Sequence, residues 1–139
     1  YLPTEGNVFI SVNKNDKMKA ISIARDFEDL GFNVIATSGT SNILNQNGVF
    51  SNNIFKIGEG RPNIVDRIKN NEIQLIINTP LGEKSRFDEH EIGKASIKFK
   101  VPAVTTIAAA KFMIRAIRMQ KNNFQRLQKM SYIYQAKVN

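Results

Sequence analysis

The chain has 139 residues, of which 42% are hydrophobic and 23% are charged, and its formal net charge is +8. This size and balance are typical of one globular domain with a core of its own. The lack of cysteine excludes disulfides, thiol nucleophiles and cysteine-ligated metals, and a single histidine, His90, excludes a multi-histidine metal site. The sequence contains no run of about 18 apolar residues, so it predicts no membrane span.

The positive charge is concentrated at the C-terminal end. Residues 101–139 hold seven Lys or Arg and no Asp or Glu, whereas residues 1–60 are close to neutral. A basic tail can bind nucleic acid, dock on an acidic neighbour or form a solvated helix face. Because the aromatic and glycine patterns of RNA-binding modules are missing from the sequence, we favour the last two interpretations over nucleic acid.

Short apolar runs alternate with longer amphipathic segments. In chain order, strands are predicted at 8–12, 33–37, 54–57, 73–78 and 103–105. Helices are predicted at 16–30, 40–46, 62–70, 88–100 and 107–120, with Pro62 as the first residue of its helix. The last helix is expected to pack through Ile107, Ala110, Ile114 and Ile117, and Phe112 and Met113 are also interpreted as core.

This alternation predicts an α/β fold, a Rossmann-like three-layer sandwich with a five-stranded parallel sheet and helices on both faces. The strands are continuous apolar runs, as expected for strands buried on both sides. We divide the chain into a linker remnant at 1–6, a domain at 7–121 and a basic C-terminal arm at 122–139, whose structure the sequence does not predict. The chain begins with Tyr1 and not with an initiator Met, so we expect a processed or excised piece of a longer protein. Its first residues do not have the pattern of a signal peptide.

Polar side chains gather where the predicted strands end, which is where open α/β sheets bind ligands. The sharpest segment is Thr37-Ser38-Gly39-Thr40, a strand end, a tight turn and a helix start. A helix start offers N–H groups to an anion, and hydroxyls and lysines add donors. The same turn is typical of a simple helix cap by Thr37 or Ser38. The hydroxyls, amides and ammonium groups at the other strand ends favour a phosphate site.

Two further segments make a resemblance to one protein family specific. Gly60-Arg61-Pro62-Asn63 precedes a predicted helix, and Ile77-Asn78-Thr79 ends the fourth predicted strand. Together with Asp16-Lys17, Ala36-Thr37-Ser38-Gly39-Thr40 and Lys56, these segments resemble, in the same order, the methylglyoxal-synthase-like effector domain of bacterial carbamoyl-phosphate synthase large subunits. The resemblance covers about residues 6–120.

The resemblance implies an allosteric regulatory domain that binds a nucleoside monophosphate such as UMP or IMP, with ornithine as a further effector near the border with a neighbouring domain. It places the effector phosphate on Lys17, Thr37, Gly39, Thr40 and Lys56. It places the base and ribose near Ile57, Asn78, Thr79 and Ile92, and the domain-border effector near Thr105.

The resemblance also implies the setting of the domain. The parent is a cytoplasmic, glutamine-hydrolysing ligase of pyrimidine and arginine biosynthesis that uses ATP and Mg²⁺. Its other parts, the rest of the large subunit and the glutaminase small subunit, are the expected partners. We expect no catalytic residue, cofactor, metal or membrane contact in this domain.

The alternative function is a methylglyoxal-synthase-type lyase acting on dihydroxyacetone phosphate, because that enzyme has the same fold and phosphate site. Its reaction needs a carboxylate base beside the phosphate. The matching stretch here, residues 80–85, has no Asp and no second glycine, although Glu83 or Asp88 could serve. His90, which lies between two glutamates, is interpreted as a surface residue and not as an acid or base.

Overall fold

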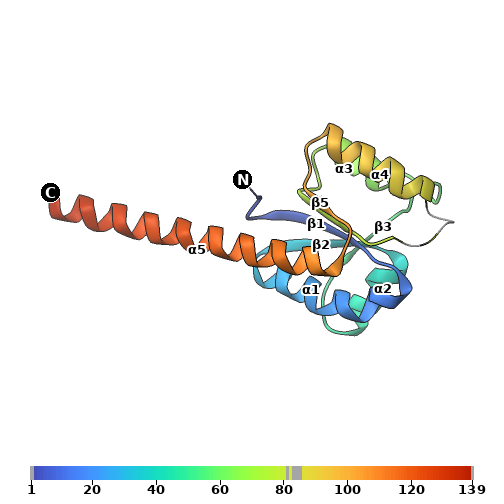
Figure 1. Ribbon diagram of the computed structural model, residues 1–139, viewed down its shortest axis with the longest axis horizontal. Coiled ribbons are helices and arrows are strands. Elements are labelled where there is room, and N and C mark those ends of the chain that lie inside the picture. Colours follow the sequence, from blue (N-terminus) through green and yellow to red (C-terminus); the bar gives the residue numbers. More distant parts are fainter. Residues whose placement is uncertain (1, 81, 83–85, 139) are drawn as a thin grey trace.

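Figure 1 shows the computed structural model, which describes residues 2–80, 82 and 86–138. The strands are β1 (Gly6–Ser11), β2 (Phe32–Thr37), β3 (Asn52–Ile54), β4 (Leu75–Asn78) and β5 (Ala103–Val104). The helices are the short 3-10 helix η1 (Lys14–Asp16) and the α-helices α1 (Lys17–Asp29), α2 (Ser38–Gln46), α3 (Ile64–Lys69), α4 (Arg86–Lys98) and α5 (Ile107–Val138).

Within the described residues, the five strands form one parallel sheet in the order β3-β2-β1-β4-β5. Strand β1 is central, and its Val8 pairs with Val34 on one side and with Leu75 on the other. The chain adds strands outward from β1 to β3 and then returns to the other side of β1. The strand order therefore reverses between β1 and β4, which is where such sheets open a crevice for ligands. The predicted five-stranded parallel sheet is confirmed.

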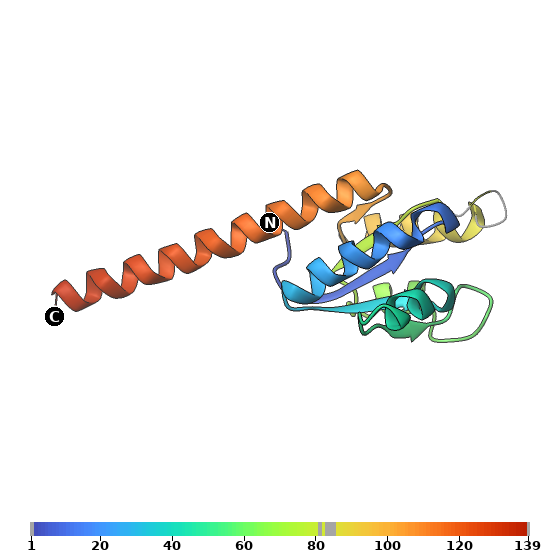
Figure 2. The ribbon, with the colours of Figure 1, turned by 90° about the horizontal axis from the view of Figure 1, so that it is seen from below.

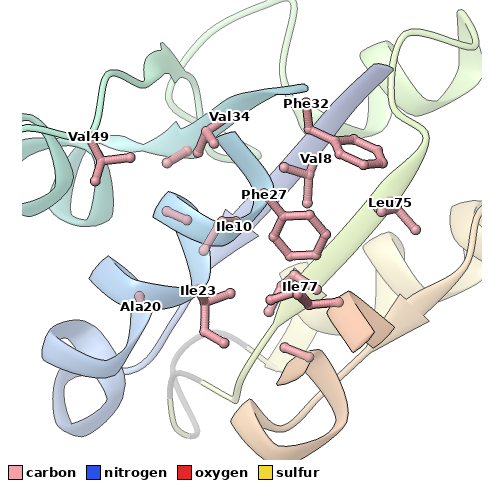
Figure 3. Packing of buried hydrophobic residues seen from close by; sticks show 14 of the residues in the cluster. Val8, Ile10, Ala20, Ile23, Phe27, Phe32, Val34, Val49, Leu75 and Ile77 are labelled. Carbon is pink, nitrogen blue, oxygen red and sulfur yellow. The ribbon is translucent and has the colours of Figure 1, made fainter. Parts of the chain in front are cut away.

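Helices cover both faces of the sheet (Figures 1 and 2). Side chains of a strand alternate between faces, so Val8 and Ile10 join one core cluster while Phe9 between them joins the other. The first cluster lies under α1 and α5, as Figure 3 shows for its larger members. There the rings of Phe27 and Phe32 meet edge to face, 5.5 Å apart. The second cluster lies under α3 and α4.

The structure corrects two predicted boundaries near the third strand. β3 ends at Ile54, so Lys56 follows the strand instead of lying in it, and the chain turns at once because Glu59 N–H donates to the Lys56 carbonyl. Pro62 is not the first residue of α3. The Asn63 side chain accepts from Val65 and Asp66 N–H, and the Asp66 carboxylate accepts from Asn63 N–H. This capping box begins the helix at Ile64.

The last helix is much longer than predicted. α5 runs from Ile107 to Val138, because no Gly or Pro interrupts the chain between them. Ala110, Met113, Ile114 and Ile117 are buried and Ile107 packs on the same cluster, as predicted. Phe112 was assigned to the core wrongly, since it is 69% exposed. Despite its length, α5 is not apolar enough to cross a bilayer, and neither is any other helix of the described chain.

The packing of α5 gives a stability prediction. Ile114→Asp should lower the free energy of unfolding by about 3 kcal/mol or more, because it removes a buried side chain and buries a charge without a partner. Urea denaturation measures the change. The control is Phe112→Asp, the same kind of substitution on the exposed side of the same helix, which should change stability by about 0.5 kcal/mol or less. Similar losses in both variants would contradict the packing of α5.

Candidate functional site

A small cavity lies beyond the carboxyl ends of β1 and β4, at the reversal of strand order. Its walls come from the strand ends, from the turn after β3 and from the start of α4. The lining residues are Phe9, Ser11, Thr37, Lys56, Ile57, Ile64, Asn78, Asp88, Glu89 and Ile92. Ser11, Thr37 and Asn78 are buried polar residues, so the sheet edge presents hydroxyl and amide groups inside an otherwise apolar wall.

Beside this cavity, the Lys17 ammonium lies over the start of α2. Lys17 is the first residue of α1, and its Nζ donates to the Val12 carbonyl at 3.1 Å and to Thr40 Oγ1 at 3.4 Å. Thr40 is buried in the first turn of α2. A Cβ at Gly39 would lie 3.6 Å from Lys17 Nζ, which is ordinary contact distance. A side chain at position 39 would therefore occupy space next to the ammonium group.

Thr37 occupies the N-cap position of α2, but its side chain makes no capping hydrogen bond. The interpretation of this turn as a simple cap by Thr37 is therefore wrong. The first N–H groups of an α-helix have no partner within the helix. A helix start with an uncapped N-cap hydroxyl and a nearby ammonium is suited to binding an anion.

The charges around the site are unevenly distributed. Burial lowers the pKa of Lys17, and the positive charge of Lys56 lowers it further. Across the cavity, burial raises the pKa of Asp88, and the negative charges of Glu59 and Glu89 act in the same direction while Lys56 opposes them. The α2 side is therefore positive and the α4 side is negative.

The structure brings most of the predicted site residues together. Thr37, Lys56, Ile57, Asn78 and Ile92 line one cavity. Lys17, Gly39 and Thr40 form a second group at the start of α2, whose N-cap residue Thr37 also lines the cavity. Two predicted residues lie elsewhere.

Thr79 does not line the cavity. Its Oγ1 accepts from Asn13 N–H at 2.8 Å and its N–H donates to the Ser11 carbonyl at 2.9 Å, so it ties the ends of β1 and β4 together. Thr105 lies in an adjoining groove that shares Asn78, Glu89 and Ile92 with the cavity.

Sequence reasoning missed five lining residues, Phe9, Ser11, Ile64, Asp88 and Glu89, as parts of a ligand site. Ser11 could have been found, because it is a polar residue within the first apolar run and lies two residues before the polar run that begins at Asn13. Asp88 was considered only as a base for the alternative lyase, and nothing local indicates that α4 brings it opposite Lys56. Glu83 and the rest of 83–85 lie outside the described residues. Among the described residues, no three His, Asp or Glu side chains gather as a metal site would require.

The strand order and these polar groups define an α/β domain with a polar-lined cavity at the switch point of a parallel sheet. The chain belongs to the MGS-like domain family, whose pattern matches residues 19–105.

The similar curated proteins are carbamoyl phosphate synthase large chains. The Nostoc sp. protein is 46% identical over 121 residues, which is 87% of this chain and 11% of that protein. The C-terminal section of the Aquifex aeolicus large chain is 46% identical over 120 residues, 86% of this chain and 22% of that section. The chain thus spans about a tenth of the length of the Nostoc relative.

Among solved structures, methylglyoxal synthase from Elizabethkingia anophelis NUHP1 superposes with a TM-score of 0.64, covering 81% of this chain and 79% of that one. At 15% sequence identity, this similarity shows a common fold.

The raised pKa of Asp88 gives a pH-dependent prediction. The native state holds this proton more tightly than the unfolded chain does, so the ionised carboxylate destabilises the fold as the pH rises through the native pKa. Asp88→Asn should therefore raise the free energy of unfolding at about pH 7, by less than about 1 kcal/mol for a partly buried group. The gain should vanish below the ordinary value of 3.8.

Urea denaturation at about pH 7 and about pH 3 measures the difference on both sides of this transition. Glu5→Gln, at an exposed position far from the cavity, controls for the loss of one negative charge. An equal gain at both pH values, or an equal gain in the control, would contradict the assignment.

Proposed function

We propose that this chain is the allosteric domain of a glutamine-hydrolysing carbamoyl-phosphate synthase and binds a nucleoside monophosphate, such as UMP or IMP, at the ends of β1, β2 and β4. The observation that carries the proposal is the Lys17 ammonium, held between the Val12 carbonyl and the Thr40 hydroxyl at the uncapped start of α2. A phosphate monoester carries up to two negative charges and three acceptor oxygens, which match these donors and the nearby Lys56.

The cavity next to the phosphate position supports a base and a ribose. Phe9, Ile57 and Ile92 supply apolar walls for a planar base, and the Asn78 amide can both donate to and accept from its edge. Asp88 and Glu89 can accept hydrogen bonds from ribose hydroxyls. The same carboxylates repel further phosphate groups, so the charge pattern favours a monophosphate over a triphosphate.

The cavity has only about 20 Å³ of free volume, which is room for one water molecule. A base and ribose need more space, and we propose that effector binding moves the start of α4 away from the strand ends. α4 packs on α3 through the second core cluster, and such a movement would be passed to that face of the domain. A ligand that binds the opened form better shifts the population toward it, which is the physical requirement for an effector.

The proposed identity of the parent protein rests on the relatives, which are named carbamoyl phosphate synthase large chains. We propose that the parent is that cytoplasmic ligase of pyrimidine and arginine biosynthesis, with ATP and Mg²⁺ bound outside this domain. Its glutaminase small subunit and the rest of its large subunit would be the protein partners. The groove beside Thr105 is a candidate for a second effector such as ornithine.

Calorimetry with UMP tests the phosphate site. Lys56→Ala and Thr40→Ala should each weaken binding by roughly 10- to 100-fold, because a hydrogen bond to a charged group contributes about 1.5–3 kcal/mol. Lys14→Ala, which removes an exposed lysine from the neighbouring η1, should leave binding unchanged. Uridine should bind far more weakly than UMP. Equal affinity for uridine and UMP, or full UMP affinity in Lys56→Ala and Thr40→Ala, would refute the site.

One observation favours the lyase as a second candidate: a carboxyl with a raised pKa, Asp88, lines the same cavity as Lys56. A general base needs such a pKa, but it must also reach the carbon-bound proton of the substrate. We expect no methylglyoxal when the chain is incubated with dihydroxyacetone phosphate. Methylglyoxal formation that Asp88→Asn abolishes would replace the regulatory proposal with the lyase.

A further inference from the structure

The second half of α5, residues 121–138, extends beyond the domain as an arm (Figures 1 and 2). Side chains from Asn122 to Lys137 are exposed, yet several of them are large and apolar. The first half of the helix carries exposed apolar residues as well. We use the term apolar stripe for Phe112, Met119, Leu127, Met130 and Tyr134, each of which is more than half exposed.

The members of the apolar stripe share one side of the helix. Phe112 and Met119 are seven residues apart, as are Leu127 and Tyr134, and seven residues return to nearly the same face. Met130 lies three residues after Leu127 and flanks the same line, whereas Phe124 follows the core-facing Ile117 by seven residues and lies on another side of the helix. Ala110, Ile114 and Ile117 face the core instead. The stripe is therefore a second apolar face that the domain itself does not cover.

Positive charges lie on and beside this face, because Arg126 follows Met119 by seven residues and Lys137 follows Met130 by seven. Arg126 precedes Met130 by one turn and Lys137 follows Tyr134 by one turn, while the Arg115 guanidinium lies 5.9 Å from the centre of the Phe112 ring. Residues 101–139 contain no Asp or Glu. The complementary surface is consequently an apolar groove bordered by carboxylates.

This charge pattern disfavours pairing between two copies of α5, because only like charges would border both helices. A lipid surface is disfavoured by Asn123 and Ser131, four residues on either side of Leu127, which place an amide and a hydroxyl within the stripe. Burying them in hydrocarbon is costly, whereas a protein groove can offer hydrogen-bond partners. The observations therefore favour an acidic protein surface.

The position of the N-terminal residues indicates where that surface is. Gln120 Nε2 donates to the Leu2 carbonyl at 2.7 Å, and Leu2 packs on the first core cluster. Leu2 is therefore held beside α5 at Gln120, where the arm leaves the domain. The relatives have most of their length outside the segment that matches this chain. A polypeptide that precedes residue 1 would begin within reach of the arm.

We propose that the arm docks through the apolar stripe into an apolar, carboxylate-bordered groove on the remaining part of the large chain. The stripe lies on α5, whereas none of the described residues of α5 lines the cavity, so this contact is separate from the candidate site. The arm would hold the domain against its neighbour whether or not an effector is bound.

Photo-cross-linking in the complete large chain tests the proposal. A benzoylphenylalanine probe replaces Leu127 in one protein and Gln125, which lies on the opposite side of the helix, in a matched control. Leu127 should give at least about tenfold more cross-linked product than Gln125, at a segment outside residues 1–139 that is bordered by Asp and Glu. Adding Arg126→Glu and Lys137→Glu to the Leu127 probe protein should reduce that product several-fold.

Two measurements on the 139-residue chain test the other occupants. Sedimentation of the chain should give a monomer. The chain should show no binding to phosphatidylserine-containing vesicles that depends on the stripe, so Leu127→Ser should not change its vesicle binding. Equal cross-linking from positions 127 and 125, links to a second copy of α5 only, a stable dimer, or stripe-dependent vesicle binding would each overturn the proposal.

Discussion

The parallel pairing of β1 with both β2 and β4 is the constraint on which the rest of the structure depends. Since β1 is central, the chain builds one half of the sheet on one side and the other half on the opposite side. The connections after β1 and β4 then diverge, and Thr79 ties the two strand ends together. Lys17 reaches back to the Val12 carbonyl from the helix that follows β1. The position of each group in the candidate site is thus set by how many residues separate it from the end of a paired strand.

The two sides of the candidate site carry opposite charges. Lys17 lies at the α2 side, Asp88 and Glu89 line the α4 side, and Lys56 interacts with both Lys17 and Asp88. Burial of Lys17 strengthens its interaction with an anion, because partial exclusion of water lowers the local dielectric. Under the proposed function, a ligand with one anionic end and neutral hydroxyl donors at the other would bind with its anionic end toward Lys17. The fold sets that orientation, since the two sides come from helices on opposite faces of the sheet.

The sequence predicted the number and direction of the strands, the buried face of α5 and the exposed position of His90, because these follow from local periodicity and composition. It also predicted Thr37, Lys56 and Asn78 as residues of strand ends that converge on one site. It could not predict that Thr79 would turn away to bond Asn13, since that depends on the spacing between two strands. It could not predict Asp88 as a lining residue either, since that depends on how α4 packs against the sheet. The apolar run at 54–57 indicated a strand, but the strand ends at Ile54 because the chain turns at Lys56, and the capping box at Asn63 then begins α3.

The two halves of α5 are held by different forces. Residues as far as Ile117 are fixed by core packing, and Lys121 Nζ adds a hydrogen bond to the Leu30 carbonyl at the end of α1. Beyond that point the helix has little except its own backbone hydrogen bonds, and an isolated helix of about 12–15 residues is marginal in water. Amide protons at the core-facing turns therefore exchange only when the domain unfolds, while those of the arm exchange through local helix–coil opening. One continuous helix thus contains two units of cooperativity, joined at Lys121.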